Sequence, residues 1–211
     1  MIKIIPAILP KTFDELVSGL ERLSSVSNEI QIDLVGRNVL KDQEMPHWQE
    51  FEFEIDVMLP EPHTELDSIL ALGPSRIVIH AANQHAKEAL TQLQSMRDGN
   101  YPTLVGIALL PTAEPEVLDE YAGLYDFIQV MGIDEVGAQG RPFNPKAIEL
   151  VSRLRALHPQ VLIQVDGHAA GNEKELVAAG AERLVIGSAI LNADNPKAAL
   201  HEALARANAG V

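Results

Sequence analysis

The chain has 211 residues, 46% of them hydrophobic, which is enough to bury a large core in one barrel-type domain or in two small domains. A formal charge of -14, from 30 acidic and 16 basic residues, argues against binding to nucleic acid or to an anionic membrane surface. The absence of cysteine excludes disulfides, thiolate metal ligands and a cysteine nucleophile. The opening "MIKIIPAILPK" lacks the pattern of a signal peptide, and no run approaches the ~18 apolar residues that span a bilayer. We therefore expect a soluble, cytoplasmic protein.

Short apolar, β-branched runs alternate with helical patterns along the whole chain. Between the runs, apolar residues recur at helical spacing and predict helices near residues 13–23, 66–70, 86–93 and 148–154. The segment 36–50 is the weakest helix prediction, because Pro46 interrupts it; His47 and Trp48 there are expected to be packing or loop residues. The runs predict eight strands, at residues 2–8, 29–35, 51–59, 76–81, 103–109, 126–131, 161–166 and 183–189.

This alternation predicts parallel strands joined by right-handed crossovers, and eight units in about 200 residues predict a single (β/α)8 TIM barrel domain over residues 1–211. An open doubly wound sheet is the alternative, but the turn after its first strand should be glycine-rich and here reads "LPKTF". "LGPSRIVIHA" (72–81) also echoes "AGAERLVIGSA" (179–189), pairing the fourth strand with the eighth. Half-barrel duplication and chance similarity both explain that echo.

Three of the predicted strands end on or near an acid in an apolar context: Asp33 in "IQIDLV", Asp56 in "EIDVML" and Asp166 in "IQVDGH". Active sites of this fold lie at the C-terminal ends of the strands. Burying a lone carboxylate is costly, so three of them on one face indicate a shared metal ion or a shared proton. The alternative for one or two of them is capping of the following loop or helix.

Glycines mark the loops after the last three strands. Loops after strands seven and eight commonly hold phosphate through backbone N–H groups, so an acidic protein needs no lysine there. Simple chain turning is the alternative for each glycine. The predicted phosphate and substrate site contains Gly137, Gly140, Arg141, Gly167, His168, Gly187 and Ser188, with His80 facing the reacting part of the ligand.

The blocks "PAILPKTF", Gln31-Ile32-Asp33, "EIDVMLPEP", Ile79-His80, "GIALLP", "MGIDEVGAQGRPF", "VDGH" and "GSAIL" follow one another in the order and spacing of known motifs. In that order the sequence resembles the ribulose-phosphate 3-epimerase family over most of its length. The resemblance implies a sugar-phosphate isomerase that moves a proton at C3 of a phosphorylated ketopentose through an enediolate. It also implies that the chain can form a homo-oligomer.

In the family a divalent metal is bound by two histidines and two aspartates, and the aspartates also act as acid and base. Both aspartates are matched here, by Asp33 and Asp166, whereas Gln31 and Asp56 stand in place of the histidines. The resemblance therefore implies Asp33 and Asp166 as catalytic residues and Gln31, Asp33, Asp56 and Asp166 as metal ligands. Because this set offers only oxygen atoms, it favours Mn²⁺ or Mg²⁺ over Zn²⁺.

Two other interpretations stay open. A hexulose-phosphate synthase or decarboxylase-like barrel would carry "D-x-K" on the third strand, but Met58 replaces the lysine in Asp56-Val57-Met58. A degenerate barrel that binds a sugar phosphate or a protein partner without turnover is supported by the loss of both histidines. Retention of Asp33, Asp166 and the phosphate-side glycines counts against it.

Overall fold

Eight parallel strands close into a barrel, in which each strand pairs with its sequence neighbours and β1 pairs with β8. The computed structural model describes residues 2–39, 48–97, 102–138 and 140–209. The predicted (β/α)8 fold is confirmed, and each predicted strand is found within about three residues of its expected ends. The strands are β1 (Lys3–Ile8), β2 (Glu29–Leu34), β3 (Glu52–Val57), β4 (Arg76–His80), β5 (Leu104–Leu109), β6 (Phe127–Met131), β7 (Leu162–Asp166) and β8 (Arg183–Ile186).

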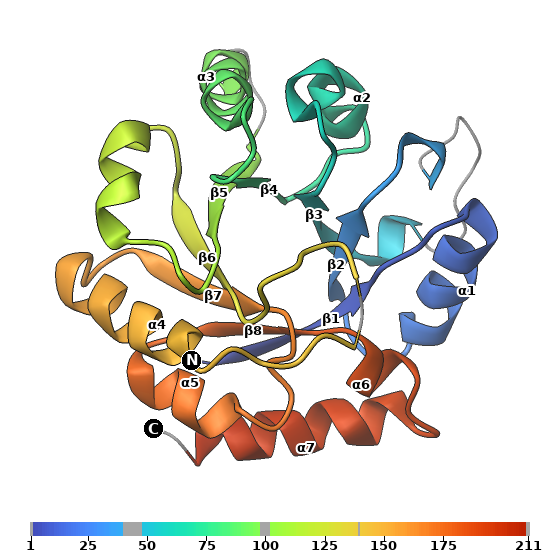
Figure 1. The fold of residues 1–211 in the computed structure, drawn as a ribbon. Coiled ribbons are helices and arrows are strands. Elements are labelled where there is room, and N and C mark those ends of the chain that lie inside the picture. The colour runs from blue at the N-terminus through green and yellow to red at the C-terminus, as the bar shows by residue number, and fades with distance from the viewer. Residues whose placement is uncertain (1, 40–47, 98–101, 139, 210–211) are drawn as a thin grey trace.

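Helices surround the strands (Figure 1). All four helices predicted from apolar spacing are confirmed, and the described residues between β2 and β3 and between β5 and β6 contain 3₁₀ turns. The helices are α1 (Phe13–Leu23), α2 (Leu66–Leu70), α3 (Ala86–Arg97), α4 (Lys146–Leu157), α5 (Glu173–Ala179), α6 (Ser188–Leu191) and α7 (Pro196–Asn208). The 3₁₀ turns are η1 (Arg37–Val39), η2 (Trp48–Glu50), η3 (Pro62–Thr64) and η4 (Pro115–Tyr121).

The weak helix prediction for residues 36–50 lies partly outside the described residues, which include neither Pro46 nor His47. The packing role predicted for Trp48 is confirmed. Its ring centroid lies 3.9 Å from that of Phe53, and its Nε1 donates a hydrogen bond of 3.2 Å to the carbonyl of Leu72. Among the described residues, no helix combines the length and apolar character needed to cross a membrane.

The interior of the barrel is polar at mid-height, although alternate strand residues face an apolar layer under the helices. A TIM barrel is ordinarily filled by branched aliphatic side chains. Here, below the aspartates at the strand ends, five side chains with at most 2% exposure carry amide, carboxyl or guanidinium groups and form a hydrogen-bonded network. They are Gln31, Glu54, Gln129, Gln164 and Arg183.

Glu29 anchors the base of this network. Its carboxylate accepts hydrogen bonds from Lys3 (2.6 Å), Arg76 (3.0 Å) and Arg183. Burial raises the pKa of Glu29, but the bonds from Lys3 and Arg183 outweigh burial and lower it. Arg76 and Arg183 occupy corresponding positions of the two echoing segments, so the echo places two cations on one buried carboxylate.

Candidate active site

Three aspartates meet at the C-terminal end of the barrel. Asp166 is the last residue of β7, and Asp33 and Asp56 lie side by side in the register of β2 and β3. One oxygen from each carboxyl lies within 4.8 Å of the others. Asp33 and Asp166 are each 7% exposed, whereas Asp56 is completely buried. Two of the three carboxyls can therefore reach a ligand, and the third lies beneath them.

A cavity of about 140 Å³ opens at these two carboxyls. Apolar groups, including Met58, Met131 and Ile133, form part of its wall. The cavity brings together nine predicted site residues: Asp33, Gly137, Gly140, Arg141, Asp166, Gly167, His168, Gly187 and Ser188. Gln31, Asp56 and His80, which were also predicted, do not line the cavity. Gln31 donates to Asp166, and His80 lies against Asp56.

Arg183 determines how the buried amides are turned. A guanidinium only donates, so the Oε1 of Gln164 faces it and accepts from Arg183 Nε at 2.6 Å. The Nε2 of Gln164 then donates to Glu54 Oε1 and to Gln129 Oε1 (2.7 Å) and lies 3.3 Å from Gln31 Oε1. This leaves Gln31 Nε2 to donate to Asp33 Oδ1 at 2.7 Å and to Asp166 Oδ2 at 3.0 Å. A single amide NH₂ group therefore bridges the carboxyls of Asp33 and Asp166, the two that line the cavity.

Asp56 has its own partners. His80 Nε2 lies 2.7 Å from Asp56 Oδ1, and Gln129 Nε2 donates to Asp56 Oδ2 at 2.7 Å. Burial lowers the pKa of His80, but the charge of Asp56 and the hydrogen bond to it raise that pKa to a greater extent. The contact with Asp56 therefore favours the imidazolium form of His80, which offsets part of the charge of Asp56.

The charges of Asp33 and Asp166 are not compensated in this way. Burial raises the pKa of Asp33 well above its usual value, and repulsion from Asp166 and Asp56 raises it further. Burial, followed by repulsion from Asp56, raises the pKa of Asp166 to about 7, against the hydrogen bonds from Gln31 and from the backbone N–H of Gly167 (2.6 Å). Two carboxyls that repel each other in one buried site favour a state in which the pair holds one proton.

The loop after β6 packs directly on the end of β7. The N–H of Gly132 donates to the carbonyl of Asp166 at 2.6 Å, and a Cβ at position 132 would lie 2.0 Å from the carbonyl oxygen of Gly167. Gly167 itself has φ 92°, and a Cβ there would lie 2.9 Å from Ile133 Cγ1. Both glycines are required for this close approach, which seats Asp166 at the cavity wall.

His168 fastens the same loop. It is the one non-glycine residue among those described that has a positive φ, 54°. Its Nδ1 lies 2.7 Å from the carbonyl of Arg141, and since a carbonyl only accepts, the ring donates there. The guanidinium of Arg141 pairs with Glu135 at 2.5 Å, so this predicted phosphate cation already has an acidic partner.

A second, smaller cavity lies beside the first, between the ends of β7 and β8. It measures about 110 Å³ and is lined by His168, Ala169, Ala170, Ile186, Gly187, Ser188 and Ala189. Gly187 and Ser188 stand where β8 passes into α6. The first N–H groups of a helix have no acceptor within the helix, so this turn offers donors at the cavity.

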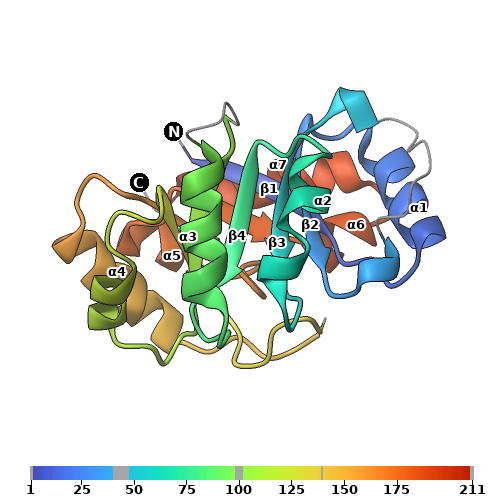
Figure 2. The same ribbon diagram turned by 90° about the horizontal axis from the view of Figure 1, so that it is seen from above.

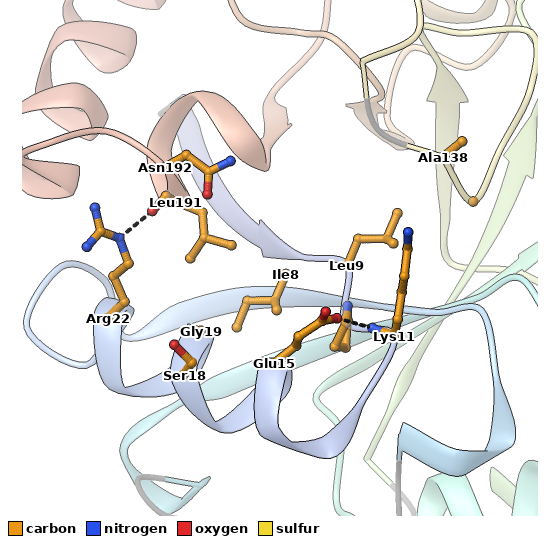
Figure 3. A pocket seen from close by; sticks show the side chains of 12 residues that line it. Ile8, Leu9, Lys11, Glu15, Ser18, Gly19, Arg22, Ala138, Leu191 and Asn192 are labelled. Carbon is orange, nitrogen blue, oxygen red and sulfur yellow. Dashed lines mark hydrogen bonds between the residues drawn. The ribbon is translucent and has the colours of Figure 1, made fainter.

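A larger groove of about 590 Å³ runs from the main cavity between α1 and α6 (Figure 3). The two hollows share Leu9, Gly137 and Ala138 as a common border. Arg22 of α1 closes the far end by donating to the carbonyls of Leu191 and Ala193. The carboxyl pair lies in the smaller hollow, so the groove is an extension of the site and not its chemical centre.

Asp33, Asp56 and Asp166 form a group able to hold a divalent cation. Their oxygens converge, and the raised pKa values of Asp33 and Asp166 reveal negative charge that a cation would stabilise. Oxygen donors of this kind suit a hard ion. Gln31, the fourth predicted ligand, presents its NH₂ group to Asp33 and Asp166, so ligation by its oxygen requires the amide to turn.

Sequence reasoning missed the second layer of the site. Gln129 and Gln164, together with Glu54 and Arg183, set the orientation of the predicted residues without touching the cavity. A usable signal was present in the sequence: "FIQVM" and "LIQVD" each place a glutamine at an inward position between aliphatic residues. A polar residue in that position requires a buried partner.

Sequence comparison identifies the family of this barrel. The profile of the ribulose-phosphate 3 epimerase family matches residues 4–191. The chain belongs to this family. Ribulose-phosphate 3-epimerase of Schizosaccharomyces pombe is 26% identical over 92% of this chain and 89% of its own length. The enzyme of that name from Eremothecium gossypii is 27% identical over 92% of this chain and 88% of its own.

Solved structures agree on the fold. A 3-hexulose-6-phosphate synthase superimposes with a TM-score of 0.68 at 18% identity, covering 97% of this chain and 99% of that one. Orotidine 5'-monophosphate decarboxylase of Sulfolobus solfataricus gives 0.65 at 16% identity, covering 99% and 98%. At these identities the likeness concerns the barrel alone. Membership of the epimerase family therefore rests on the sequence matches.

Proposed function

We propose that this protein is a sugar-phosphate epimerase that moves a proton at C3 of a phosphorylated ketopentose, with Asp33 and Asp166 as acid and base. The observation that carries the proposal is the pair itself. Two carboxyls line one cavity, are bridged by one amide donor, and have raised pKa values, with that of Asp166 at about 7. General acids and bases work best when their pKa values lie near the working pH.

Inversion at C3 follows from one shared proton. The ionised carboxyl removes the C3 proton from one face of the ketose, and the C–H electron pair moves into an enediolate with the neighbouring carbonyl. The protonated carboxyl then delivers its proton to C3 from the other face, and the carbonyl re-forms. C3 now carries its hydrogen on the other face, and the pair again holds one proton, which is on the carboxyl that began as the base.

Gln31 and His80 stabilise the carboxyl pair with one proton. Gln31 donates to both carboxyls, so it stabilises the negative charge whichever carboxyl is ionised. His80 offsets part of the charge of Asp56 beneath the pair. When bound, a divalent ion at Asp33, Asp56 and Asp166 would supply Lewis-acid stabilisation of the enediolate, with Mn²⁺ or Mg²⁺ preferred because the ligands are oxygens.

We assign the phosphate of the substrate to the side of the cavity made by Gly167, His168, Gly187 and Ser188. Backbone donors at that turn hold an anion without lysine. His168 contributes by holding the β6 loop at Arg141. The remaining expectations stay predictions: one domain over residues 1–211, a cytoplasmic location, homo-oligomer formation and no binding to nucleic acid.

The test is proton exchange with solvent. Ribulose 5-phosphate is incubated with the protein in deuterated water, with and without Mn²⁺, and exchange at C3 is followed by NMR. Exchange that is abolished by Asp33→Asn and by Asp166→Asn, but not by Asp119→Asn on the exposed face of η4, supports the proposal. Binding of the sugar phosphate without exchange supports the degenerate barrel. No binding at all overturns the phosphate assignment as well.

A further inference from the structure

A second cluster of metal-ligating side chains lies outside the barrel mouth. It consists of His63 in η3, His85 just before α3 and Glu88 in the first turn of α3. One nitrogen or oxygen from each residue lies within 4.8 Å of the others. Figure 2 shows α2, which follows η3, beside α3, on the outside of β3 and β4. The cluster thus joins the segments that follow these two strands.

The three side chains are turned toward a common point. Glu88 Oε2 lies 3.4 Å from His85 Nδ1 and 3.9 Å from His63 Nε2. The two imidazole rings are close neighbours, with centroids 4.4 Å apart and planes inclined by 36°. Ligands about 2 Å from one tetrahedral ion are separated by similar distances, so small side-chain movements would complete the sphere.

The backbone that carries these residues is held on both sides. Asn83 donates to the carbonyls of Leu59 (2.9 Å) and Pro60 (3.2 Å) and accepts from the N–H of His85 (2.8 Å). On the other flank Arg37 pairs with Glu65 at 3.1 Å and donates to Thr64 Oγ1 at 3.0 Å. The cluster is therefore placed by ordered contacts between loops and not by one mobile segment.

His85 Nε2 lies 3.2 Å from Nε2 of the Gln84 side-chain amide, and turning that exposed amide over would let its oxygen accept the N–H opposite a metal-bound Nδ1. His63 is mostly buried, its side chain 16% exposed, and its Nδ1 has no hydrogen-bond partner among the described residues. Its Nε2 lies 3.9 Å from Glu88 Oε2, too far for a hydrogen bond and near enough for both atoms to bind one ion.

We propose that His63, His85 and Glu88 form a second metal site, for a first-row transition ion such as Zn²⁺ or Co²⁺. Two imidazole nitrogens and one carboxylate oxygen are the donor set that such ions prefer over Mg²⁺. The half-exposed Glu88 leaves room for water as a fourth ligand. The ion links the β3–α2 segment to α3, and the site differs in donor type from the all-oxygen group of Asp33, Asp56 and Asp166.

The difference in donor type gives the test. Protein stripped with EDTA is held in excess Mg²⁺, which absorbs no visible light and prefers the oxygen site, and is titrated with Co²⁺. We expect one Co²⁺ per chain with the visible absorption of a tetrahedral nitrogen–oxygen complex, and Zn²⁺ should displace it. His85→Gln and Glu88→Gln should each weaken binding by at least about tenfold, the cost of losing even an outer partner of a metal site.

Two controls make the outcome decisive. His201→Gln removes an exposed histidine from α7 and should bind Co²⁺ as the unaltered protein does. Asp166→Asn should also leave this binding unchanged. Zn²⁺ should raise the Tm of the unaltered protein and not that of His85→Gln. No visible Co²⁺ spectrum, equal affinity in His85→Gln and Glu88→Gln, or loss of binding in Asp166→Asn alone would each overturn the proposal.

Discussion

Replacing Gln31 by methionine tests how the carboxyl pair is controlled. The two side chains have similar length and volume, but methionine cannot donate to Asp33 or Asp166. A hydrogen bond to a charged group contributes about 1.5–3 kcal/mol, and one pKa unit corresponds to about 1.4 kcal/mol. Losing the donor should therefore raise the pKa of each carboxyl by about 1–2 units, starting from about 7 for Asp166.

The active form holds one proton on the pair, so the rate of C3 exchange should follow a bell-shaped curve in pH. In Gln31→Met the whole bell should move to higher pH by about 1–2 units, because both ionisations become harder. Gln129→Met is the matched control. It removes a donor at the same depth that serves Asp56, not the pair, and should move the curve much less. Curves that coincide, or a bell that moves to lower pH, would refute the bridging role of Gln31.

Three further changes test other parts of the site. The pKa of Asp166 is about 7 in the folded protein and 3.8 as the ordinary value of an unfolded chain, so the folded protein loses stability as pH rises from 4 to 7. Asp166→Asn should therefore raise Tm at pH 8 and not at pH 4, and its gain in free energy of unfolding is at most about 4 kcal/mol. An Asn variant that is less stable at pH 8 would contradict the idea that burying the Asp166 carboxylate destabilises the folded protein. His168→Gly relieves a positive φ worth about 1 kcal/mol but cuts the tether to Arg141, so stability should change little while KM rises; an unchanged KM would show that the tether is dispensable. Ser18→Trp fills the groove along α1 and should leave kcat/KM for ribulose 5-phosphate within about twofold, a range of less than 0.5 kcal/mol; a larger loss would place the substrate in the groove.

The strands and the residues at their ends could be predicted from the sequence because each depends on local information. Short apolar, β-branched runs that alternate with helical patterns predict the barrel. An acid that ends such a run lies at the barrel mouth, because all the strands are parallel. Asp33, Asp166 and the glycines after β7 and β8 were found in this way, and all of them line one cavity. The same reasoning could not separate the two carboxyls that line the cavity from Asp56, because access to the cavity depends on how deep each residue lies in the closed barrel.

The orientation of these buried amides could not be predicted, because it depends on contacts between different strands, whose residues are 19 positions apart for Arg183 and Gln164 and 133 apart for Gln164 and Gln31. Arg183 at the base of β8 turns Gln164 of β7, which turns Gln31 of β2 toward the pair. No local pattern encodes such a chain of donors and acceptors. The amide of Gln31 directs its two N–H groups at Asp33 and Asp166, and so supplies positive potential at the place where the proposed reaction develops negative charge.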